Sequence, residues 1–318
     1  MSDATSSIVA LTGATGFIGQ HLQRVLLDAG FGVRALVRES VTKSSASSSA
    51  LLPGCEIVTV DLDAEDSVAA AIDGADAIVY AAGSVRGRTF ADFQTANVNG
   101  VATMVAAITK APGEIPLLLI SSLAASAPEL SYYAGSKAAG EQVLRNSTLG
   151  SWSIFRPPAV YGPGDKEMRP ILNAIRRGLV PLIAPPEQQL PFIEVSDLVA
   201  AILAWLKHAD ACAGRTFAID DGTSGGYDWG QVQQLVAPAR ALQIRVPGAL
   251  LEALGHVNLS LSKLMGYAPM LTPGKVRELT YLNWACDNTG FSTATDWQPQ
   301  LTLGDGVARM FDSGSAHT

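Results

Sequence analysis

A tyrosine and a lysine four positions apart, Tyr133 and Lys137, are the residues of this chain best suited to proton transfer. The sequence from Tyr133 to Leu144 predicts a helix, and a spacing of four places both side chains on one helix face. A phenol with an ordinary pKa near ~10 is a poor acid or base at neutral pH unless a neighbouring cation stabilises its phenolate. The pair therefore predicts general acid–base chemistry at Tyr133, with Lys137 as the cation.

Two serines and an asparagine precede this pair along the chain. Ser121 and Ser122 close an apolar run that predicts a strand, so their hydroxyls are expected at the carboxyl edge of a sheet, where ligands bind in open α/β folds. Either hydroxyl is able to hydrogen-bond a substrate oxygen, and either is able simply to form a turn. Asn97, in the predicted helix Phe93–Thr109, is interpreted as holding a water that relays protons to the lysine or as bending the helix.

A glycine-rich turn, Gly13-Ala-Thr-Gly16-Phe-Ile-Gly19, follows the first predicted strand and opens the first predicted helix. Glycines at this spacing permit a tight turn and a close approach to a pyrophosphate, whose charge the N–H groups at the helix start stabilise. A simple capping turn would share the pattern, but the flanking strand and helix favour a dinucleotide site. The expected cofactor-binding residues here are Gly13, Thr15, Gly16, Phe17, Ile18 and Gly19.

The end of the second predicted strand bears on which dinucleotide is bound. Arg38 lies where the adenosine ribose is expected, and an arginine suits the 2′-phosphate of NADP. A carboxylate at this place suits the 2′-hydroxyl of NAD, and Glu39 follows immediately. Lys43 is close enough along the chain to assist Arg38. We expect NADP in preference to NAD.

The ends of the next two predicted strands supply further expected cofactor contacts. Asp61 is predicted either to accept a hydrogen bond from the adenine amino group or to cap the helix that follows. Leu62 would add an apolar wall beside the adenine. Ala81, Ala82 and Gly83 are small enough for the cofactor to pass close to the backbone.

These residues need a scaffold, and the first 160 residues carry the pattern of one. Short apolar runs alternate with helical stretches, and their near-continuous Val, Ile and Leu content is typical of parallel strands covered on both faces. The pattern predicts an α/β fold, with a Rossmann-type doubly wound parallel sheet over residues 1–160. The predicted strands are Ile8–Thr12, Gly32–Val37, Cys55–Val60, Ala77–Ala81, Leu117–Ser121 and Ser153–Arg156.

The chain changes character after Arg156, where prolines and glycines become frequent. Residues 161–318 are expected to form a smaller, mostly helical substrate cap, with a segment near 190–220 returning to the Rossmann sheet. The leucine-rich stretch Val246–Tyr267 carries few charges. Its leucines are expected either to pack as a helical core or to line an apolar substrate site.

Composition excludes several other classes of protein. Hydrophobic residues make up 48% of the chain and charged residues 16%, which is too apolar for a disordered protein. The formal net charge of −7 argues against a general nucleic-acid binder. No apolar run could span a bilayer and no secretory signal is recognised, so a cytoplasmic location is expected. The separated Cys55, Cys212 and Cys286 predict neither a disulfide framework nor a metal site.

Taken in order, these motifs resemble the extended short-chain dehydrogenase/reductase superfamily, in its NAD-dependent epimerase/dehydratase-like branch. The tail from Lys275 to Asn288 is similar to that of 3β-hydroxysteroid dehydrogenase-like members. The segments that carry the main resemblance are Thr12–Gly19, Asp61-Leu62, Asn97–Gly100, Ser121-Ser122, Tyr133–Lys137, Arg156–Gly164 and Phe192–Asp197.

The resemblance implies a role for each residue of the site. Tyr133 would be the general acid/base, Lys137 would lower its pKa and bind the nicotinamide ribose, and Ser122 would position the substrate oxygen. Asn97 would be the fourth catalytic member, and Pro157–Val160 would line the nicotinamide side. The resemblance also implies a homodimer formed through the helices that hold Asn97 and Tyr133.

Three functions are consistent with these residues. The first, which we expect, is hydride transfer between a nicotinamide and a secondary alcohol or ketone of an apolar small molecule. The second is a redox-neutral nucleotide-sugar epimerase or dehydratase with a recycled NAD. Tyr133 follows Ser122 by only eleven positions, fewer than the resemblance leads us to expect of sugar-nucleotide epimerases. The third is a non-catalytic nucleotide-binding subunit, which the intact Tyr133/Lys137 pair disfavours.

Overall fold

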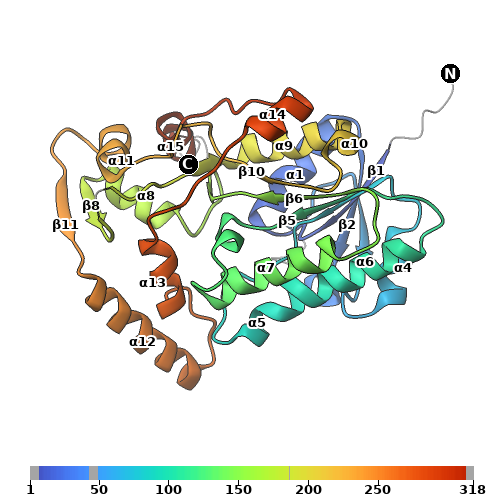
Figure 1. The fold of residues 1–318 in the computed structure, drawn as a ribbon, viewed down its shortest axis with the longest axis horizontal. Coiled ribbons are helices and arrows are strands. Elements are labelled where there is room, and N and C mark those ends of the chain that lie inside the picture. Colours follow the sequence, from blue (N-terminus) through green and yellow to red (C-terminus); the bar gives the residue numbers. More distant parts are fainter. Residues whose placement is uncertain (1–6, 43–48, 186, 313–318) are drawn as a thin grey trace.

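Seven parallel strands form the central sheet of this computed structural model, which describes residues 7–42, 49–185 and 187–312 (Figure 1). The strand order is β10-β6-β5-β4-β1-β2-β3, which confirms the predicted Rossmann-type doubly wound sheet. Lys43 and most of the serine-rich stretch after it lie outside the described residues. The strands are β1 Ile8–Thr12, β2 Gly32–Val37, β3 Cys55–Thr59, β4 Ala77–Tyr80, β5 Leu117–Ile120, β6 Trp152–Arg156 and β10 Arg215–Ala218.

Helices cover both faces of the sheet because successive strand residues point to opposite sides. In β1, Val9 and Leu11 pack with helices α1 (Phe17–Asp28) and α9 (Val195–Lys207). Ala10, between them, faces the second core. Helices α4 (Glu65–Ile72), α6 (Gly100–Lys110) and α7 (Tyr132–Arg145) pack there, and α6 and α7 run side by side in Figure 1.

The predicted strand boundaries hold to within one residue. β3, β4 and β5 each end one residue earlier than predicted, and β6 begins one residue earlier. The residues just after these strand ends therefore lie at the carboxyl edge of the sheet, where the site residues were expected.

The predicted helix over Tyr133–Leu144 is present as α7. It begins at Tyr132 because the Ser131 hydroxyl caps it, accepting a hydrogen bond from the N–H of Ala134 at 2.9 Å.

The prediction of one regular helix over Phe93–Thr109 is wrong. The segment consists of α5 (Phe90–Gln94), a π-helical turn η1 (Thr95–Asn99) and α6. The Tyr80 hydroxyl, buried under the turn, donates to the carbonyl of Ala96 at 2.8 Å. A Cβ at Gly100 would lie 2.2 Å from that hydroxyl, so glycine is needed beside it. The wide turn accommodates the tyrosine, and a π-helical turn of this kind often marks a functional site.

Small sheets and helices make up the C-terminal region. β7 (Ala159–Tyr161) pairs with β9 (Phe192–Glu194), and β8 (Leu179–Leu182) pairs with β11 (Leu242–Arg245). A third core of buried apolar residues, including Leu172, Val232 and Val307, holds these elements together. The remaining elements described are α2 Glu39–Thr42, η2 Leu123–Ser126, α8 Arg169–Arg176, α10 Ala209–Cys212, α11 Trp229–Val236, α12 Gly248–Met265, α13 Pro273–Thr280, α14 Thr289–Thr295 and α15 Leu303–Asp312.

The C-terminal half returns to the Rossmann sheet twice. α9 and β10 fall within the predicted return near 190–220. A second return, which the sequence analysis did not predict, brings α14 back against the first core. The Phe291 ring is fully buried and lies 5.0 Å from the Phe155 ring and 5.2 Å from the Phe217 ring. Residues from both ends of the chain therefore share one core.

The leucine-rich stretch does not form a packed core. It folds as α12, and Leu250, Leu254 and Leu261 are about half exposed. Only a narrow face, which includes Gly255 and Ser262, is buried. Among the described residues, no helix is both long and apolar enough to cross a membrane.

Candidate active site

The glycine turn between β1 and α1 is shaped for an anion. Gly13 has φ +70°, and a Cβ there would lie 2.6 Å from the backbone of Ala81; a Cβ on Gly19 would lie 2.2 Å from the Gly13 carbonyl oxygen. Packing of the turn therefore requires both glycines. Gly16 is different, since it is exposed and its Cβ would meet only the Gly13 oxygen, at 3.1 Å.

Gly16 is also the N-cap of α1, and no side chain caps the helix there. The N–H groups of a first helical turn have no partner within the helix, and the helix dipole favours negative charge at that end. Exposed glycine and uncapped N–H groups together fit a pyrophosphate. Thr15, Phe17 and Ile18 complete the turn and are half-buried.

The expected adenosine-binding residues lie at the next strand ends. Arg38 directly follows β2 and is exposed. Asp61 is also exposed, and its Oδ1 accepts the N–H of Asp63 at 3.0 Å. The alternative interpretation of Asp61 as a helix cap is wrong, because the N-cap of α4 is Ala64. Leu62 is half-buried against the second core.

The small residues after β4 lie between the glycine turn and the catalytic candidates. Ala82 donates its N–H to the Thr12 hydroxyl at 3.1 Å, which joins this loop to the end of β1. A Cβ on Gly83 would lie 3.0 Å from Asn97 Oδ1 and 3.1 Å from Lys137 Nζ. The loop from Ala81 to Gly83 thus connects the expected cofactor site to the lysine.

Tyr133 and Lys137 extend from the first turns of α7. Lys137 is buried and its Nζ donates to the carbonyl of Ile120, the last residue of β5, at 3.0 Å. Burial lowers the pKa of Lys137 to about 8, while the nearby Glu141 carboxylate favours the charged form. Burial raises the pKa of Tyr133 to about 12, opposed by the Ser122 hydroxyl. The pKa of Tyr133 is therefore raised, whereas the resemblance implied that Lys137 lowers it, and Tyr133 is a neutral phenol near pH 7, able to donate a proton.

The two adjacent serines have different surroundings. Ser121 is buried, and its hydroxyl donates to Glu141 Oε1 at 2.6 Å. The same carboxylate accepts two hydrogen bonds from Arg156, at 2.8 and 2.6 Å. Ser122 accepts the N–H of Ala124 at 3.2 Å and lies close enough to the Tyr133 phenol to lower its pKa. Ser121 therefore belongs to a buried ion-pair network, and Ser122 lies beside the phenol.

Asn97 projects from the π-helical turn and is buried. Its Oδ1 accepts the N–H of Ser84 at 3.0 Å, and its Nδ2 donates to the Ser84 carbonyl at 3.1 Å and to the Ser136 hydroxyl at 2.8 Å. The side chain therefore links the loop after β4 to α7. Its Oδ1 also lies near Lys137, since both atoms approach Gly83.

The residues expected to line the nicotinamide follow β6, which neighbours β5 on the side away from β4. Pro157 is buried directly after β6, and its carbonyl accepts the N–H of Leu123 at 2.8 Å. Val160, in β7, is half-buried against the first core. Both positions follow the strand next to β5, at the same edge as Ser122.

Helix α13 contributes residues that the sequence analysis did not assign to the site. Lys275 Nζ lies 5.9 Å from the centre of the Tyr133 ring. Glu278 is buried, pairs with Lys275 at 2.8 Å and accepts a hydrogen bond from the Ser131 hydroxyl. α13 therefore covers the start of α7. The only signal was the family-like tail, which gives no indication of this contact.

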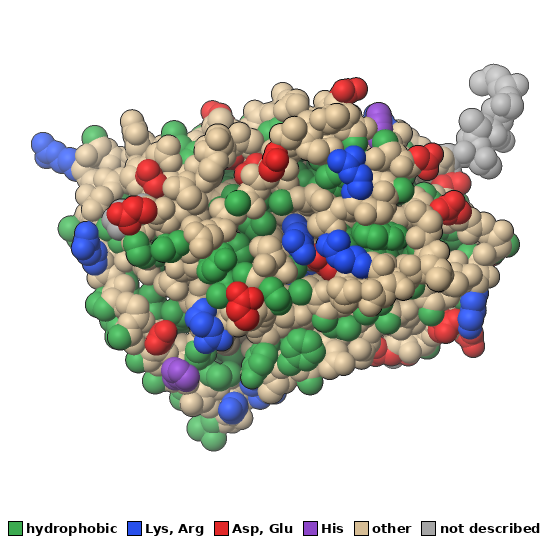
Figure 2. Space-filling view, viewed as in Figure 1, with side chains coloured by type: hydrophobic (Ala, Val, Ile, Leu, Met, Phe, Trp, Pro, Cys, Tyr) green, Lys and Arg blue, Asp and Glu red, His purple; other side chains and the backbone are tan. Residues whose placement is uncertain are grey.

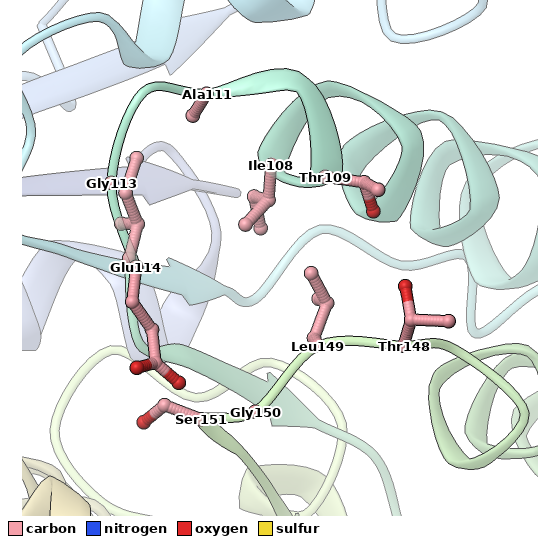
Figure 3. Close-up of a pocket in the computed structure, with 10 residues that line it drawn as sticks. Ile108, Thr109, Ala111, Gly113, Glu114, Thr148, Leu149, Gly150 and Ser151 are labelled. Carbon is pink, nitrogen blue, oxygen red and sulfur yellow. The ribbon is translucent and has the colours of Figure 1, made fainter.

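The pocket drawn in Figure 3 lies at the other edge of the sheet. It is lined by the end of α6, including Ile108 and Thr109, and by the segments that lead into β5 and β6. Leu117 and Trp152 begin those strands, so this is the amino edge. The pocket is therefore separate from the candidate active site.

A comparison with known families supports the arrangement of these elements. The profile described as the NAD dependent epimerase/dehydratase family matches residues 9–219, from β1 through β10. The chain belongs to this family. The matched range of this chain contains the glycine turn, Ser122, Tyr133 and Lys137. NAD(P) is therefore the cofactor class of this family member, and the uncapped start of α1 fits its pyrophosphate.

Individual proteins are similar to all or most of this chain. A ceramide reductase of Caulobacter vibrioides is 31% identical over 100% of this chain and 95% of its own length. A 2-alkyl-3-oxoalkanoate reductase of Stenotrophomonas maltophilia is 27% identical, over 67% of this chain and 70% of its own. The structure of WbmG from Bordetella bronchiseptica in complex with NAD has a TM-score of 0.71 at 16% identity, covering 100% and 96% of the two chains, which shows the shared fold.

Proposed function

We propose that this family member is an NADPH-dependent reductase that converts a ketone of an apolar, chain-bearing substrate into a secondary alcohol. The observation that carries the proposal is the neutral Tyr133 phenol at the carboxyl edge of the sheet, with the Ser122 hydroxyl beside it and the buried Lys137 amine one helical turn away. This arrangement supplies a proton donor, an orienting group and a cation. Those are the groups that carbonyl reduction requires of a protein.

Four side chains have separate roles in the proposed reduction. NADPH, when bound at the glycine turn, would provide the hydride for the carbonyl carbon. The Ser122 hydroxyl orients the carbonyl oxygen, and Tyr133 donates its phenolic proton to that oxygen as negative charge develops on it. The Lys137 ammonium stabilises the phenolate that remains. Asn97 acts as a positioning residue, because its amide holds the Ser84 backbone against α7.

The proposed substrate class rests on two relatives named for the reduction of molecules that contain hydrocarbon chains. The ceramide reductase is similar over the full chain, and the 2-alkyl-3-oxoalkanoate reductase over two thirds of it. The exposed leucines of α12 add apolar surface to the cap side of this chain. The first compound to test is a ceramide analogue in which the secondary alcohol is oxidised to a ketone.

Loss of NADPH absorbance on addition of this ketone tests the proposal. Tyr133→Phe should lower kcat by ~10²–10⁴-fold, because the proton donor is lost, while NADPH binding persists. Tyr132→Phe is the matched control, since Tyr132 is 58% exposed, and should retain the wild-type rate. Turnover by Tyr133→Phe at the wild-type rate would refute the mechanism. Stoichiometric NAD(H) released on denaturation would instead favour the redox-neutral epimerase or dehydratase.

The preference for NADP over NAD is part of the proposal and rests on Arg38. Its exposed guanidinium directly follows β2, where it could pair with a 2′-phosphate. Arg38→Ala should raise the KM for NADPH about tenfold or more and leave the KM for NADH unchanged, and Arg24→Ala should change neither. Equal wild-type KM values for NADPH and NADH would contradict the preference.

A further inference from the structure

Helix α12 carries an apolar stripe that no other described part of the protein covers. Leu250, Leu254, Val257, Leu261 and Leu264 alternate at spacings of four and three, which places them on one face of the helix. Their exposed fractions run from 45% for Leu261 to 84% for Leu264. Met265, beside Leu264, is 72% exposed. Exposed apolar patches of this kind mark sites of interaction with proteins or membranes.

The stripe is distinct from the face by which α12 is attached to the protein. A Cβ on Gly255 would lie 3.0 Å from the Pro273 nitrogen, so this face lies directly on the start of α13. Asn258 Nδ2 donates to the carbonyl of Leu271 at 2.8 Å, which adds a second point of attachment. One face of α12 therefore packs on α13 and the segment before it, and the leucines of the stripe are exposed on a different face.

The same helix pair connects the stripe to the candidate active site. α13, on which α12 packs, places Lys275 over the Tyr133 ring. Arg88, on the loop that follows Gly83, donates to the carbonyl of Ser262 in α12 at 3.4 Å. An apolar molecule on the stripe would therefore be one helix away from the proton donor.

The charge of this region differs from that of the whole chain. Residues 240–278 contain five Lys or Arg and two Asp or Glu, whereas the whole chain has a net charge of −7. Figure 2 shows hydrophobic side chains along the lower left edge of the molecule, where α12 lies in Figure 1. Around the stripe, the exposed cations Arg240 and Arg245 before α12 and Lys263 within it outnumber the one carboxylate of the helix, Glu252. Apolar residues with a surplus of cations nearby suit an anionic lipid surface. Two copies of this region facing each other would bring like charges together, which disfavours self-association.

We propose that the α12 stripe docks on the surface of an anionic lipid bilayer. The 18-residue helix, about 27 Å long, would lie in the plane of the interface with its leucines among the acyl chains. Docking would bring α13 and the Tyr133 end of α7 to the bilayer, so that an apolar ketone enters the site directly from the lipid. Docking itself is independent of the proposed reductase function, and only the delivery of substrate rests on it.

Flotation of the full chain with vesicles of phosphatidylglycerol and phosphatidylcholine tests the docking. The wild type should float, and the double variant Leu254→Gln/Leu261→Gln should lose at least tenfold in vesicle partitioning. Leu235→Gln on α11 is the matched control, because Leu235 and Leu254 are each 46% exposed, and it should float like the wild type. Unchanged NADPH binding by the double variant shows that it is folded.

Reductase activity measured on a vesicle-embedded ketone and on a water-soluble ketone separates docking from the reductase function. The double variant should reduce a vesicle-embedded ketone at least tenfold more slowly than the wild type and a short water-soluble ketone at the same rate. Equal flotation of the double variant and the wild type would overturn the docking proposal. The docking proposal would also be overturned if the wild type were a dimer that does not bind vesicles and the double variant were a monomer. Vesicle binding without reduction of either ketone would support docking and contradict the reductase.

Discussion

Burial acts in opposite directions on the two titratable groups at the centre of the site. It raises the pKa of Tyr133 to about 12 and lowers the pKa of Lys137 to about 8, because removal from water disfavours whichever form is charged. The result is a proton donor that keeps its proton at neutral pH, next to an amine that titrates much closer to neutrality. Perturbed groups of this kind cluster at functional sites.

The reduction rate should therefore fall as pH rises through about 8. Lys137 is charged below that pH and neutral above it, since its pKa is lowered from 10.5, and a neutral amine does not stabilise the Tyr133 phenolate. A kcat/KM profile from pH 6 to 10 measures this. Lys137→Arg, which stays charged, should move the decline to higher pH. A wild-type profile that stays flat across pH 8 would contradict the role of Lys137.

Substituting the two serines separately should separate catalysis from stability. Ser122→Ala should lower kcat about tenfold or more with an unchanged Tm, because its hydroxyl lies by the phenol. Ser121→Ala should keep kcat within tenfold but lower the unfolding free energy by ~1–3 kcal/mol, because the buried Glu141 loses a donor. Kinetics and thermal unfolding on both variants check this. The reverse pattern would assign the catalytic hydroxyl to Ser121.

At the scale of elements, the sequence predicted the sheet well because its signals are local. Each strand is a short apolar run, and the glycine turn is marked by residues only three positions apart. Two elements depend on distant contacts and were missed for that reason. The π-helical turn follows from the Tyr80 hydroxyl bonding to Ala96, and the cover over Tyr133 comes from Lys275 on α13.

The three glycines of the turn should respond differently to alanine. Gly13→Ala and Gly19→Ala should destabilise the fold by a few kcal/mol, because the added Cβ would lie 2.6 and 2.2 Å from backbone atoms. Gly16→Ala should fold, since its Cβ meets one atom at 3.1 Å, but should weaken NADPH binding about tenfold or more. Thermal unfolding and a binding titration distinguish the cases. Full NADPH affinity in Gly16→Ala would contradict pyrophosphate binding at this position.

At the scale of the molecule, the N-terminal sheet and the C-terminal region depend on each other. Phe291, from α14, fills the first core between Phe155 and Phe217. The sequence predicted a return to the sheet near 190–220 but not this one, since nothing in residues 289–297 indicates which core they enter. The packed core that was one of two expectations for the α12 leucines is not formed, because periodicity identifies an apolar face without showing what covers it. On α6, which is one of the helices of the expected homodimer, Val101 and Met104 are fully buried in the chain's own core, so a partner would contact other residues of that helix.

Phe291→Ala should weaken both halves together. Removal of a fully buried ring costs ~3–5 kcal/mol, so the Tm should fall by several degrees while calorimetry still shows one transition. Phe90→Ala, at a ring that is 36% exposed, is the control and should cost much less. Two separate transitions in either protein would show that the halves unfold independently.

The wide turn at Thr95–Asn99 also keeps side chains spaced four residues apart on the same face of the helix. Phe93, Asn97 and Val101 repeat every four residues, and in a regular helix of 3.6 residues per turn that repeat drifts by about 40° at each step. The wider turn cancels the drift, so all three side chains meet α7, at Tyr133, Ser136 and Gly140. In a regular helix over the same residues, Phe93 and Val101 would lie about 80° apart around the helix axis, so the helix would align either one with α7, but not both. Deleting one residue of the turn would leave Phe93 and Val101 seven residues apart, which a regular helix places within about 20° of each other, so the wide turn accommodates one extra residue.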